Sequence, residues 1–222
     1  MALDGQPVTP SLVGAMTLNR LAATAALARR AGLASGLVLE LGVGEYPYAR
    51  SATTVSLDID RAYGPDALGD AHALPFATAS FDTVVASQVF EHLHTPAQAL
   101  GEVARVLRPG GRLVLAIPFL YFVHQAPHDY QRLTRFGLEH LFADHPFDIE
   151  IDAFGGRVPA AFDLLFTSTR SSSVPRRALR KLRKTVAPPR PQEVTRLGRW
   201  LADRDPHEFP MGYVVVGTRL AT

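Results

Sequence analysis

Short apolar runs alternate with helix-forming stretches in the first half of the sequence, and this alternation constrains the fold more than any other feature. The run Leu37–Gly42 is apolar, ends in glycine and is too short for a helix, which is typical of a buried parallel strand. Three further runs are predicted strands: Thr53–Asp60, which is β-branched early and acidic at its C-terminal end, Phe81–Ser87 and Arg112–Pro118. Strands that alternate with helices predict a parallel sheet with crossover helices on its faces.

Two stretches have the periodicity of amphipathic helices. Ser11–Ala34 places its apolar residues roughly on one face, with Gly32 near its end. Pro96–Leu107 begins with proline, and its apolar positions follow the i, i+3, i+4, i+7 spacing. The sequence Arg-Pro-Gly-Gly at Arg108–Gly111 predicts a tight turn that closes this second helix.

The C-terminal half contributes two further strands. Phe147–Phe154 alternates with period two, and Gly212–Leu220 is strongly β-forming. We expect the two to pair in antiparallel fashion at one side of the sheet, joined by a long connection. The predicted fold class is therefore α/β, a Rossmann-like three-layer sandwich whose seven-stranded, mostly parallel sheet has an antiparallel strand near the C-terminus.

Composition excludes several classes of protein. The 222 residues, 47% of them hydrophobic, suffice for one domain with a full core. The absence of cysteine excludes disulfides, iron–sulfur clusters, thiolate zinc sites and a cysteine nucleophile. No apolar run approaches the roughly 20 residues that cross a membrane, and the start MALDGQPVTPSL lacks the features of a secretory signal. We therefore expect a cytoplasmic protein.

Charge is distributed unevenly along the chain. Residues 168–200 carry ten Lys or Arg and one acid, a net charge of +9, whereas the rest of the chain is at −7. We interpret this segment as a solvated flap. Two alternatives are an anionic-substrate site and a helix at 176–184 that touches an anionic membrane surface. Aromatic residues are not interleaved with the basic ones, so nucleic acid is not an expected partner.

The ends of the first two strands carry residues suited to a cofactor. In open α/β sheets, ligands bind at the carboxyl ends of the strands where the strand order reverses. The first strand ends with Glu40, Gly42 and Gly44, and glycines let the backbone approach a ligand closely. Asp58 ends the second strand and can accept hydrogen bonds from two ribose hydroxyls. These residues fit NAD, FAD or S-adenosylmethionine.

Two features favour S-adenosylmethionine over a dinucleotide. The dinucleotide fingerprint G-x-G-x-x-G requires a third glycine where Pro47 stands. The carboxylate of Glu40 suits a cationic amino acid tail better than an anionic pyrophosphate. An NAD-linked oxidoreductase or epimerase is the first alternative, but the Tyr-xxx-Lys pair usual in such enzymes is absent from the sequence.

Five blocks of sequence carry a family resemblance: Gly69–Phe76, Ser80–Asp82, Glu91–Leu93, Glu102 and Arg105–Gly111. Their order and spacing resemble those of class I S-adenosylmethionine-dependent methyltransferases, most closely the small-molecule group that includes the quinone-biosynthesis enzymes. The resemblance covers residues 37–118. The family's usual third glycine, two residues after Gly44, is Tyr46 here.

The resemblance implies that S-adenosylmethionine is bound, and S-adenosylhomocysteine released, at the carboxyl ends of the parallel strands. The cofactor-binding residues it implies are Glu40, Gly42 and Gly44 at the methionine part, Asp58 at the ribose, Ile59 and Asp70 with Ala71 at the adenine, and Ser87 and Gln88 at the amino acid tail. A structural interpretation of the same positions also exists, in which the glycines end a strand, Asp58 caps it and Asp70 starts a turn.

The segment after the predicted strand Arg112–Pro118 is the predicted substrate side. Residues 118–134 are dense in aromatic and polar side chains and are similar to a methyltransferase subgroup associated with polysaccharide or secondary-metabolite pathways. Methyl transfer needs alignment, a dry pocket and sometimes a base. The candidate catalytic residues are His128 as general base, His92 and Asp129, and the candidate substrate-binding residues are His124, Tyr130 and Arg132.

The same residues have structural alternatives. Asp129 and Arg132 would then form an ordinary ion pair, His128 would cap the turn after Pro127, and His92 would pack beneath the methionine tail. No metal is expected, because neither His92-x-His94 nor His124-xxx-His128 makes a convincing site. The second spacing would need a helix, which Pro127 opposes.

The resulting hypothesis is a single methyltransferase domain over residues 1–222 that methylates O, N or C of a small metabolite, such as a sugar or secondary metabolite. Its expected parts are an N-terminal helical cap (11–36), a cofactor-binding core (37–118), a substrate-side segment (119–146) and a basic insertion (168–210). The second alternative is a non-catalytic S-adenosylmethionine-binding module, which the substitution at Tyr46 favours.

Overall fold

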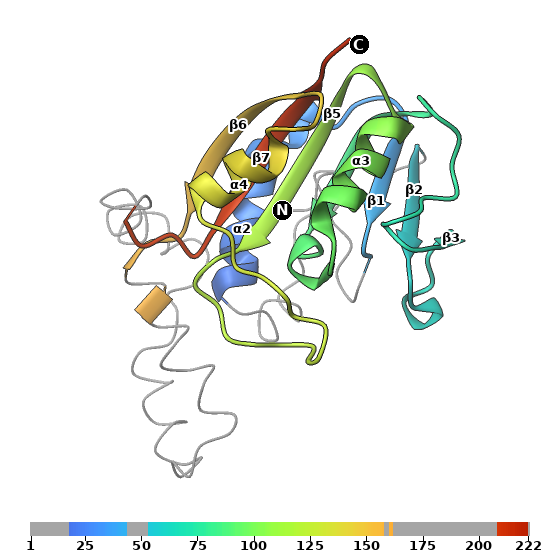
Figure 1. Ribbon diagram of the computed structural model, residues 1–222. Coiled ribbons are helices and arrows are strands. Elements are labelled where there is room, and N and C mark those ends of the chain that lie inside the picture. Colours follow the sequence, from blue (N-terminus) through green and yellow to red (C-terminus); the bar gives the residue numbers. More distant parts are fainter. Residues whose placement is uncertain (1–17, 44–52, 158–159, 162–207, 222) are drawn as a thin grey trace.

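The computed structural model describes residues 18–43, 53–157, 160–161 and 208–221. Its strands are β1 (Val38–Leu41), β2 (Thr54–Asp58), β3 (Ala67–Leu68), β4 (Phe81–Ser87), β5 (Leu107–Pro118), β6 (Phe147–Phe154) and β7 (Gly212–Arg219). They form one seven-stranded sheet in the order β3-β2-β1-β4-β5-β7-β6 (Figure 1). The strand order reverses between β1 and β4, because the chain runs outward from β1 to β3 and then returns to the other side of β1.

Burial explains why the central strands are apolar throughout. All four residues of β1 and six of the seven residues of β4 are buried. Parallel strands covered on both faces have no polar side, which gives the continuous apolar runs seen in the sequence. The edge strand β6 instead alternates between exposed and less exposed residues, as its period-two pattern predicts.

Strand β7 runs against the other six strands. It pairs antiparallel with both β5 and β6, which confirms the predicted pairing of the two C-terminal strands and the single reversed strand. Gly212 allows the three strands to approach. A Cβ at this position would lie 2.4 Å from the Ile117 carbonyl oxygen and 2.4 Å from the Phe154 ring.

Helices cover both faces of the sheet. The α-helices are α2 (Leu18–Arg29), α3 (Pro96–Val106) and α4 (Arg135–Phe142), and the short 3-10 helices are η1 (Ala31–Leu33), η2 (Arg61–Tyr63) and η3 (Phe90–His92). Figure 1 shows α3 and α4 in front of the sheet and α2 behind it. Each face has its own apolar cluster, one containing Leu100 and Val103 of α3 and the other Leu27 of α2. The predicted three-layer architecture is therefore confirmed.

Three details of the sequence prediction were wrong. The first helix ends at Arg29 rather than Ala34, and η1 follows it across Gly32; its predicted start, residues 11–17, lies outside the described residues. The run at 108–111 is no turn between elements, because β5 already begins at Leu107 and this run forms a bulge opposite β4. Strand β3 was not recognised, since two residues carry no periodicity.

None of the helices that the structure describes has the length and apolar character needed to cross a membrane. The predicted basic insertion lies outside the described residues from 168 to 207, and so does its part 176–184. Gly44, Tyr46 and Pro47 lie outside them as well.

Candidate active site

Three neighbouring strands bring predicted cofactor residues to one edge of the sheet. Glu40 of β1 pairs in register with Ser56 of β2 and Val85 of β4. Asp58 and Ser87 are the last residues of β2 and β4. Because the strands are parallel, their carboxyl ends meet where the strand order reverses, which is the usual ligand position in such sheets. We call this place, with Glu40, Asp58 and Ser87, the cofactor edge.

Gly42 follows β1 and is required by the local packing. Its φ angle is +70°, which residues with a side chain rarely adopt. A Cβ would lie 2.3 Å from Cγ2 of Val89, in the turn after β4. The Gly42 N–H also donates to the Leu57 carbonyl at 2.9 Å. The structural interpretation of this glycine therefore holds, whether or not a ligand also approaches it.

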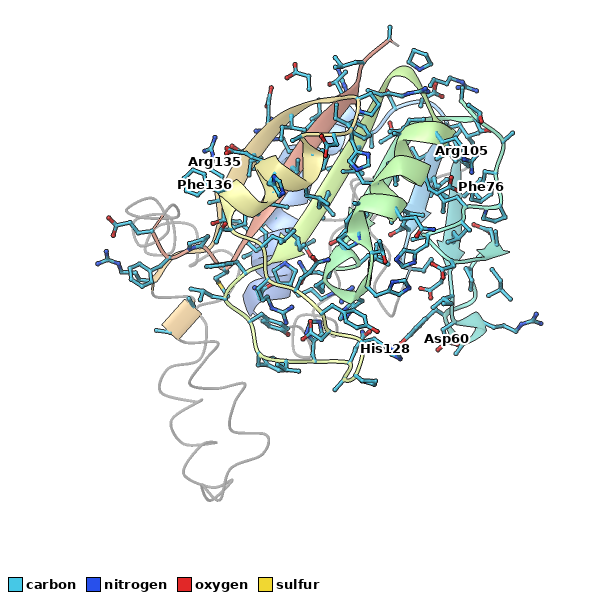
Figure 2. The ribbon with its side chains drawn as sticks, in the orientation of Figure 1. Asp60, Phe76, Arg105, His128, Arg135 and Phe136 are labelled. Carbon is cyan, nitrogen blue, oxygen red and sulfur yellow. The ribbon has the colours of Figure 1, made fainter. Side chains whose placement is uncertain are left out.

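Asp58 and Ile59 differ sharply in exposure. The Asp58 side chain is buried, and its Oδ1 accepts the Asp60 N–H at 2.9 Å, so the residue caps the strand end as the structural alternative predicted. Ile59 is 77% exposed, which is unusual for a large apolar residue. Figure 2 shows Asp60 and His128 at the same end of the molecule. The cofactor edge thus faces the end where the segment after β5 lies.

Asp70 is held by the residue two positions after it. Its Oδ1 accepts the His72 N–H at 2.9 Å and lies 2.6 Å from His72 Nδ1. The backbone N–H of His72 lowers the pKa of the Asp70 carboxyl, with the His72 ring adding to the effect. Asp70 also starts a turn, since its carbonyl accepts the Ala73 N–H at 3.0 Å. Ala71 is buried between them.

Two charged residues of α3 fix the loop that carries Asp70. Glu102 accepts the Leu74 N–H at 2.7 Å. Arg105 donates to the Leu74 and Phe76 carbonyls at 2.9 and 2.8 Å, and it pairs with Glu102 (Figure 2). These contacts join the blocks Gly69–Phe76 and Arg105–Gly111 in the fold.

The end of β4 presents buried polar side-chain atoms. Ser87 Oγ and Gln88 Nε2 make no hydrogen bond within the described part of the chain. The backbone of Gln88 has a φ angle of +56°, and its N–H donates to the Ala116 carbonyl at 2.8 Å. Buried polar atoms are normally satisfied, so this edge has capacity for a ligand.

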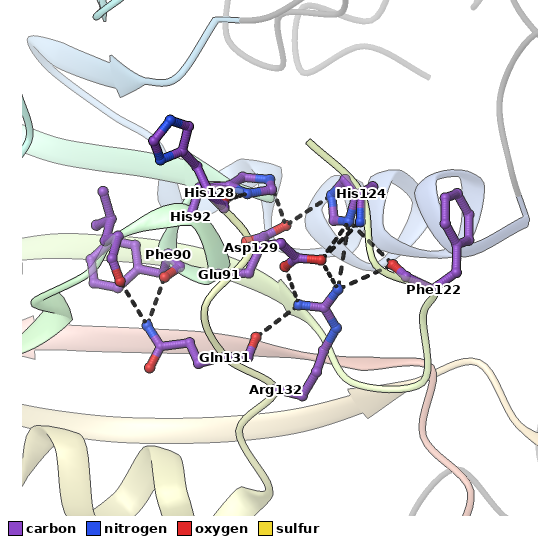
Figure 3. Close-up of polar contacts among 10 residues, drawn as sticks. Phe90, Glu91, His92, Phe122, His124, His128, Asp129, Gln131 and Arg132 are labelled. Atoms are coloured by element: carbon purple, nitrogen blue, oxygen red, sulfur yellow. Dashed lines mark hydrogen bonds and ion pairs between the residues drawn. The ribbon is translucent and has the colours of Figure 1, made fainter. Parts of the chain in front are cut away.

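Glu91 follows directly in η3 and is completely buried, at 0% exposure. Burial raises the pKa of its carboxyl to about 8. Its Oε1 lies 3.7 Å from His92 Nε2 and 3.9 Å from His124 Nε2 (Figure 3). Burial likewise lowers the pKa of both imidazoles, because it disfavours their charged forms. We call these three residues the Glu-His-His cluster.

Residues 119–134, the acceptor segment, contain neither helix nor strand. Arg132 donates to both carboxylate oxygens of Asp129 at 2.6 and 2.7 Å, and also to the Phe122 carbonyl at 3.2 Å. Asp129 further accepts the His124 N–H at 2.9 Å. Burial alone would raise the pKa of Asp129, but these hydrogen bonds, first those from Arg132, lower it. The pairing of Asp129 with Arg132 that the structural alternative predicted is therefore present, and the Asp129 side chain is 2% exposed.

His128 and Tyr130 lie on the exposed rim of the acceptor segment. His128 Nδ1 lies 2.9 Å from the Tyr130 hydroxyl, and the His128 N–H donates to the Gln125 carbonyl at 3.0 Å. The carbonyl of His128 contacts His92 Nδ1 at 2.6 Å. This contact joins two of the predicted catalytic histidines through the backbone, while the His128 ring itself points away to Tyr130.

Sequence reasoning missed the convergence of Glu91 with His92 and His124. It named Glu91 only as the start of the sequence block Glu91–Leu93, and it paired the histidines by spacing. His94 instead stacks on His72, with ring centroids 4.2 Å apart. Gln131 was also missed; its Nε2 donates to the Phe90 and Leu93 carbonyls and ties the acceptor segment to η3. The acid–histidine pair Glu91-His92 shortly after β4 was a signal for part of the cluster, but no signal in the sequence related this pair to His124.

Comparison with known proteins finds a methyltransferase likeness in part of the chain. Residues 31–115 match the family model described as "Methyltransferase domain". The demethylmenaquinone methyltransferase of Renibacterium salmoninarum is 38% identical over 86 residues, which cover 34% of this chain and 36% of that protein. Residues 31–115 are therefore similar to the methyltransferase domains of the class I, S-adenosylmethionine-dependent family. The matches span between 15% and 36% of the length of the first two curated relatives.

Solved structures share the fold. A S-adenosylmethionine-dependent methyltransferase from Thermotoga maritima aligns with a TM-score of 0.58 at 16% identity over 91% of both chains. Phosphoethanolamine N-methyltransferase 2 from Haemonchus contortus, solved with phosphomonomethylethanolamine and S-adenosylhomocysteine, aligns with a TM-score of 0.55 at 16% identity. The alignment covers 90% of this chain and 53% of that one. The predicted Rossmann-like class is confirmed.

Proposed function

We propose that this chain transfers a methyl group from S-adenosylmethionine to O, N or C of a small metabolite. The observation that carries the proposal is the meeting of Glu40, Asp58 and Ser87 at the point where the strand order reverses. The family match supports it, and two structures of the Haemonchus enzyme contain S-adenosylhomocysteine or S-adenosyl-L-methionine. When bound, this cofactor supplies an electrophilic methyl group.

Each residue of the cofactor edge suits one part of the cofactor. The buried carboxylate of Glu40 would favour the ammonium group of the methionine tail. Asp58 would accept from the ribose hydroxyls, and the exposed Ile59 would offer an apolar surface to the adenine. Asp70 and Ala71 would bind the adenine edge. Ser87 Oγ and Gln88 Nε2, which lack a hydrogen bond within the described residues, would contact the amino acid tail, as would Gly42 and Gly44.

The acceptor segment would hold the methyl acceptor. Displacement at a methyl group depends mainly on alignment and on exclusion of water. The rings of Tyr121, His124 and His92 pack edge to face, with centroids 5.0 and 4.7 Å apart, and form a rigid wall beside Glu91. His128 and Tyr130 on the rim, with Arg132 behind them, would position a polar acceptor. His128 is the proposed base where the acceptor atom carries a proton.

Relatives of this chain are named for different acceptor atoms. A relative from Roseobacter denitrificans is named a C-methyltransferase, and the Haemonchus enzyme an N-methyltransferase. The proposal therefore keeps O, N and C as acceptor atoms. Carbon is the first to screen, with quinone-type acceptors, because the sequence relatives include demethylmenaquinone methyltransferases.

Calorimetric titration tests the cofactor part of the proposal. The purified chain is titrated with S-adenosylmethionine, S-adenosylhomocysteine and NADH. We expect micromolar binding of the two sulfur compounds and none of NADH. Asp58→Asn should weaken the binding roughly 100-fold, because two charge-assisted hydrogen bonds are lost. Asp148→Asn, on the exposed edge strand β6, is the matched control and should bind as the wild type does.

The titration separates the alternatives. Binding of NADH alone would support an oxidoreductase and sink the proposal. Binding of S-adenosylhomocysteine without methylation of any acceptor in a broad screen would favour a non-catalytic module. Transfer of a labelled methyl group to an acceptor, lost in Asp58→Asn and kept in Asp148→Asn, is the result that we expect.

A further inference from the structure

The Glu-His-His cluster has the composition of a metal site. The ligand atoms of Glu91, His92 and His124 all lie within 4.8 Å of one another, and a segment far along the chain brings His124 to the two residues of η3 (Figure 3). The carboxylate is fully buried and the two imidazoles are partly buried. Two histidines with one carboxylate form the ligand set of many catalytic zinc and non-haem iron sites.

The hydrogen bond to His92 fixes which of its nitrogens is free. Nδ1 lies 2.6 Å from the carbonyl oxygen of His128. A carbonyl oxygen only accepts, so Nδ1 carries the proton and Nε2 presents a lone pair. This Nε2 is buried without a hydrogen-bond partner among the described residues, and it faces Glu91, which as a carboxylate only accepts.

The contacts of His124 indicate the same tautomer as in His92. Its Nδ1 lies 3.3 Å from the Phe122 carbonyl and 3.4 Å from Asp129 Oδ2, and both are acceptors. The neighbouring donor, Arg132 Nη2, is farther away at 3.5 Å and is already bonded to those two oxygens. Nδ1 therefore carries the proton, and Nε2 points its lone pair toward Glu91. A carboxylate that orients a histidine from behind is the usual arrangement around metal-bound histidines.

The Glu91 carboxylate and the Nε2 atoms of His92 and His124 are three facing hydrogen-bond acceptors. Neither of the Glu91 carboxylate oxygens accepts a hydrogen bond from another of the described residues. Facing acceptors are costly when buried unless something positive lies between them. A single proton on Glu91 would satisfy one imidazole and leave the other unpaired. A cation satisfies all three groups together.

We propose that Glu91, His92 and His124 bind one divalent transition-metal ion such as Zn²⁺, Co²⁺ or Mn²⁺. Ligand atoms about 2.1 Å from a metal lie about 3.0–3.4 Å apart. Side-chain shifts would bring the 3.7 and 3.9 Å separations, and that between the two imidazole nitrogens of at most 4.8 Å, into that range. Two imidazole nitrogens select against Mg²⁺ and Ca²⁺, which prefer oxygen. Three protein ligands leave a coordination position for a non-protein oxygen.

The open position indicates the acceptor class, and this step rests on the proposed function. An acceptor with a hydroxyl, enol or phenol oxygen could bind the ion directly. Its proton would then pass to solvent more readily, because the ion stabilises the oxygen anion. The ion would thus promote deprotonation of an oxygen acceptor, which is the role of a general base in other sites.

Metal titration of tag-free protein tests the proposal. The protein is stripped with a chelator and titrated with Co²⁺, Zn²⁺ and Mg²⁺, with calorimetry and the visible absorption of Co²⁺ as readouts. We expect one Co²⁺ or Zn²⁺ per chain and much weaker binding of Mg²⁺. The isosteric Glu91→Gln and the truncation His124→Ala should each weaken Zn²⁺ binding by roughly 100-fold, and Asp129→Asn by about tenfold.

His140→Ala is the matched control, because it removes an exposed histidine of α4 far from the cluster in sequence. It should bind metal as the wild type does. Absence of Co²⁺ and Zn²⁺ binding to folded wild-type protein, or equal binding by Glu91→Gln, would overturn the proposal. Circular dichroism of each variant separates loss of the site from loss of the fold.

Titration of the same samples with S-adenosylhomocysteine keeps the two proposals apart. Binding of S-adenosylhomocysteine without Zn²⁺ overturns the metal site alone. Binding of Zn²⁺ without S-adenosylhomocysteine supports the metal site and overturns the proposed methyl transfer.

Discussion

The cofactor edge and the acceptor segment are built in different ways. Backbone pairing positions the edge, because the register of β1 with β2 and β4 places Glu40, Asp58 and Ser87 at one end of the sheet. The acceptor segment has no such ladder. Side chains hold it, above all Arg132, which bonds to Asp129 and to the carbonyls of its neighbours. A strand-built site can be inferred from local sequence pattern, whereas a site held by side chains depends on contacts between distant residues.

Gly42→Ala should disrupt the cofactor edge with the largest effect. The new Cβ would have to accept a φ of +70° and would meet Val89 at 2.3 Å. Together these effects should lower the free energy of unfolding by about 3 kcal/mol, measured by urea denaturation. Adding Val89→Ala should recover part of the loss. Gly32→Ala is the control, since a Cβ there meets no atom within 4 Å; equal stability of the Gly42 and Gly32 variants would contradict the account.

Arg132→Gln should break the acceptor segment and leave the cofactor edge intact. It removes the partner of Asp129, whose side chain is 2% exposed, and should cost about 2 kcal/mol of unfolding free energy. Methyl transfer should fall while the Kd for S-adenosylhomocysteine stays unchanged. Arg135→Gln, which removes an exposed pair with Glu139, should change neither quantity. Weakened cofactor binding in Arg132→Gln would show that the two regions are not independent.

Ser87→Ala should sharpen the comparison, because we expect it to stabilise the free protein but to weaken ligand binding. Ser87 Oγ is buried without a hydrogen bond in the described part of the chain, so alanine should stabilise the free protein by about 0.5–1 kcal/mol. The same change should weaken binding of S-adenosylhomocysteine several-fold. Ser80→Ala is the opposite control, since Ser80 Oγ donates to the Ala77 carbonyl at 2.7 Å and its removal should destabilise. Thermal melting with and without ligand checks both signs.

Asp70→Asn should have the smallest effect, visible mainly in acid. The His72 N–H holds the pKa of Asp70 below its usual value of about 4. The resulting stabilisation is present above that usual value and is lost as the pH falls through the lowered pKa. Because Asp70 is half exposed, solvent screening reduces the effect to a fraction of a kcal/mol. Melting temperatures between about pH 2.5 and 6 should fall less steeply in the variant than in the wild type; parallel curves would refute this role.

The sequence predicted those parts of the fold that local pattern determines. The bounds of β4 and the start of α3 agree with the prediction, since an apolar run and an N-terminal proline mark them. The bulge at 108–111 was missed because it arises from pairing with β4. Strand β3 exists only through its ladder with Leu57 and Asp58 of β2.

The site residues also divide into those that local sequence pattern could place and those that depend on contacts between distant residues. Asp58 and Ser87 could be placed at the edge because they end predicted strands, although the His72 bond to Asp70 has no signature in the sequence. The contact of Glu91 with His124 could not be predicted, because no periodicity relates residues on opposite sides of β5. Burial of the Glu91 carboxylate depends equally on packing between elements, so only the structure reveals it.

Backbone hydrogen exchange, measured with and without S-adenosylhomocysteine, tests the central claim most directly. The cofactor edge should gain protection in peptides that cover residues 40–43, 57–60 and 86–89, at the ends of β1, β2 and β4. The edge strand β6 should exchange at the same rate in both samples. Protection confined to other parts of the sheet, or no protection at a saturating concentration, would contradict the assignment of this edge as the cofactor site.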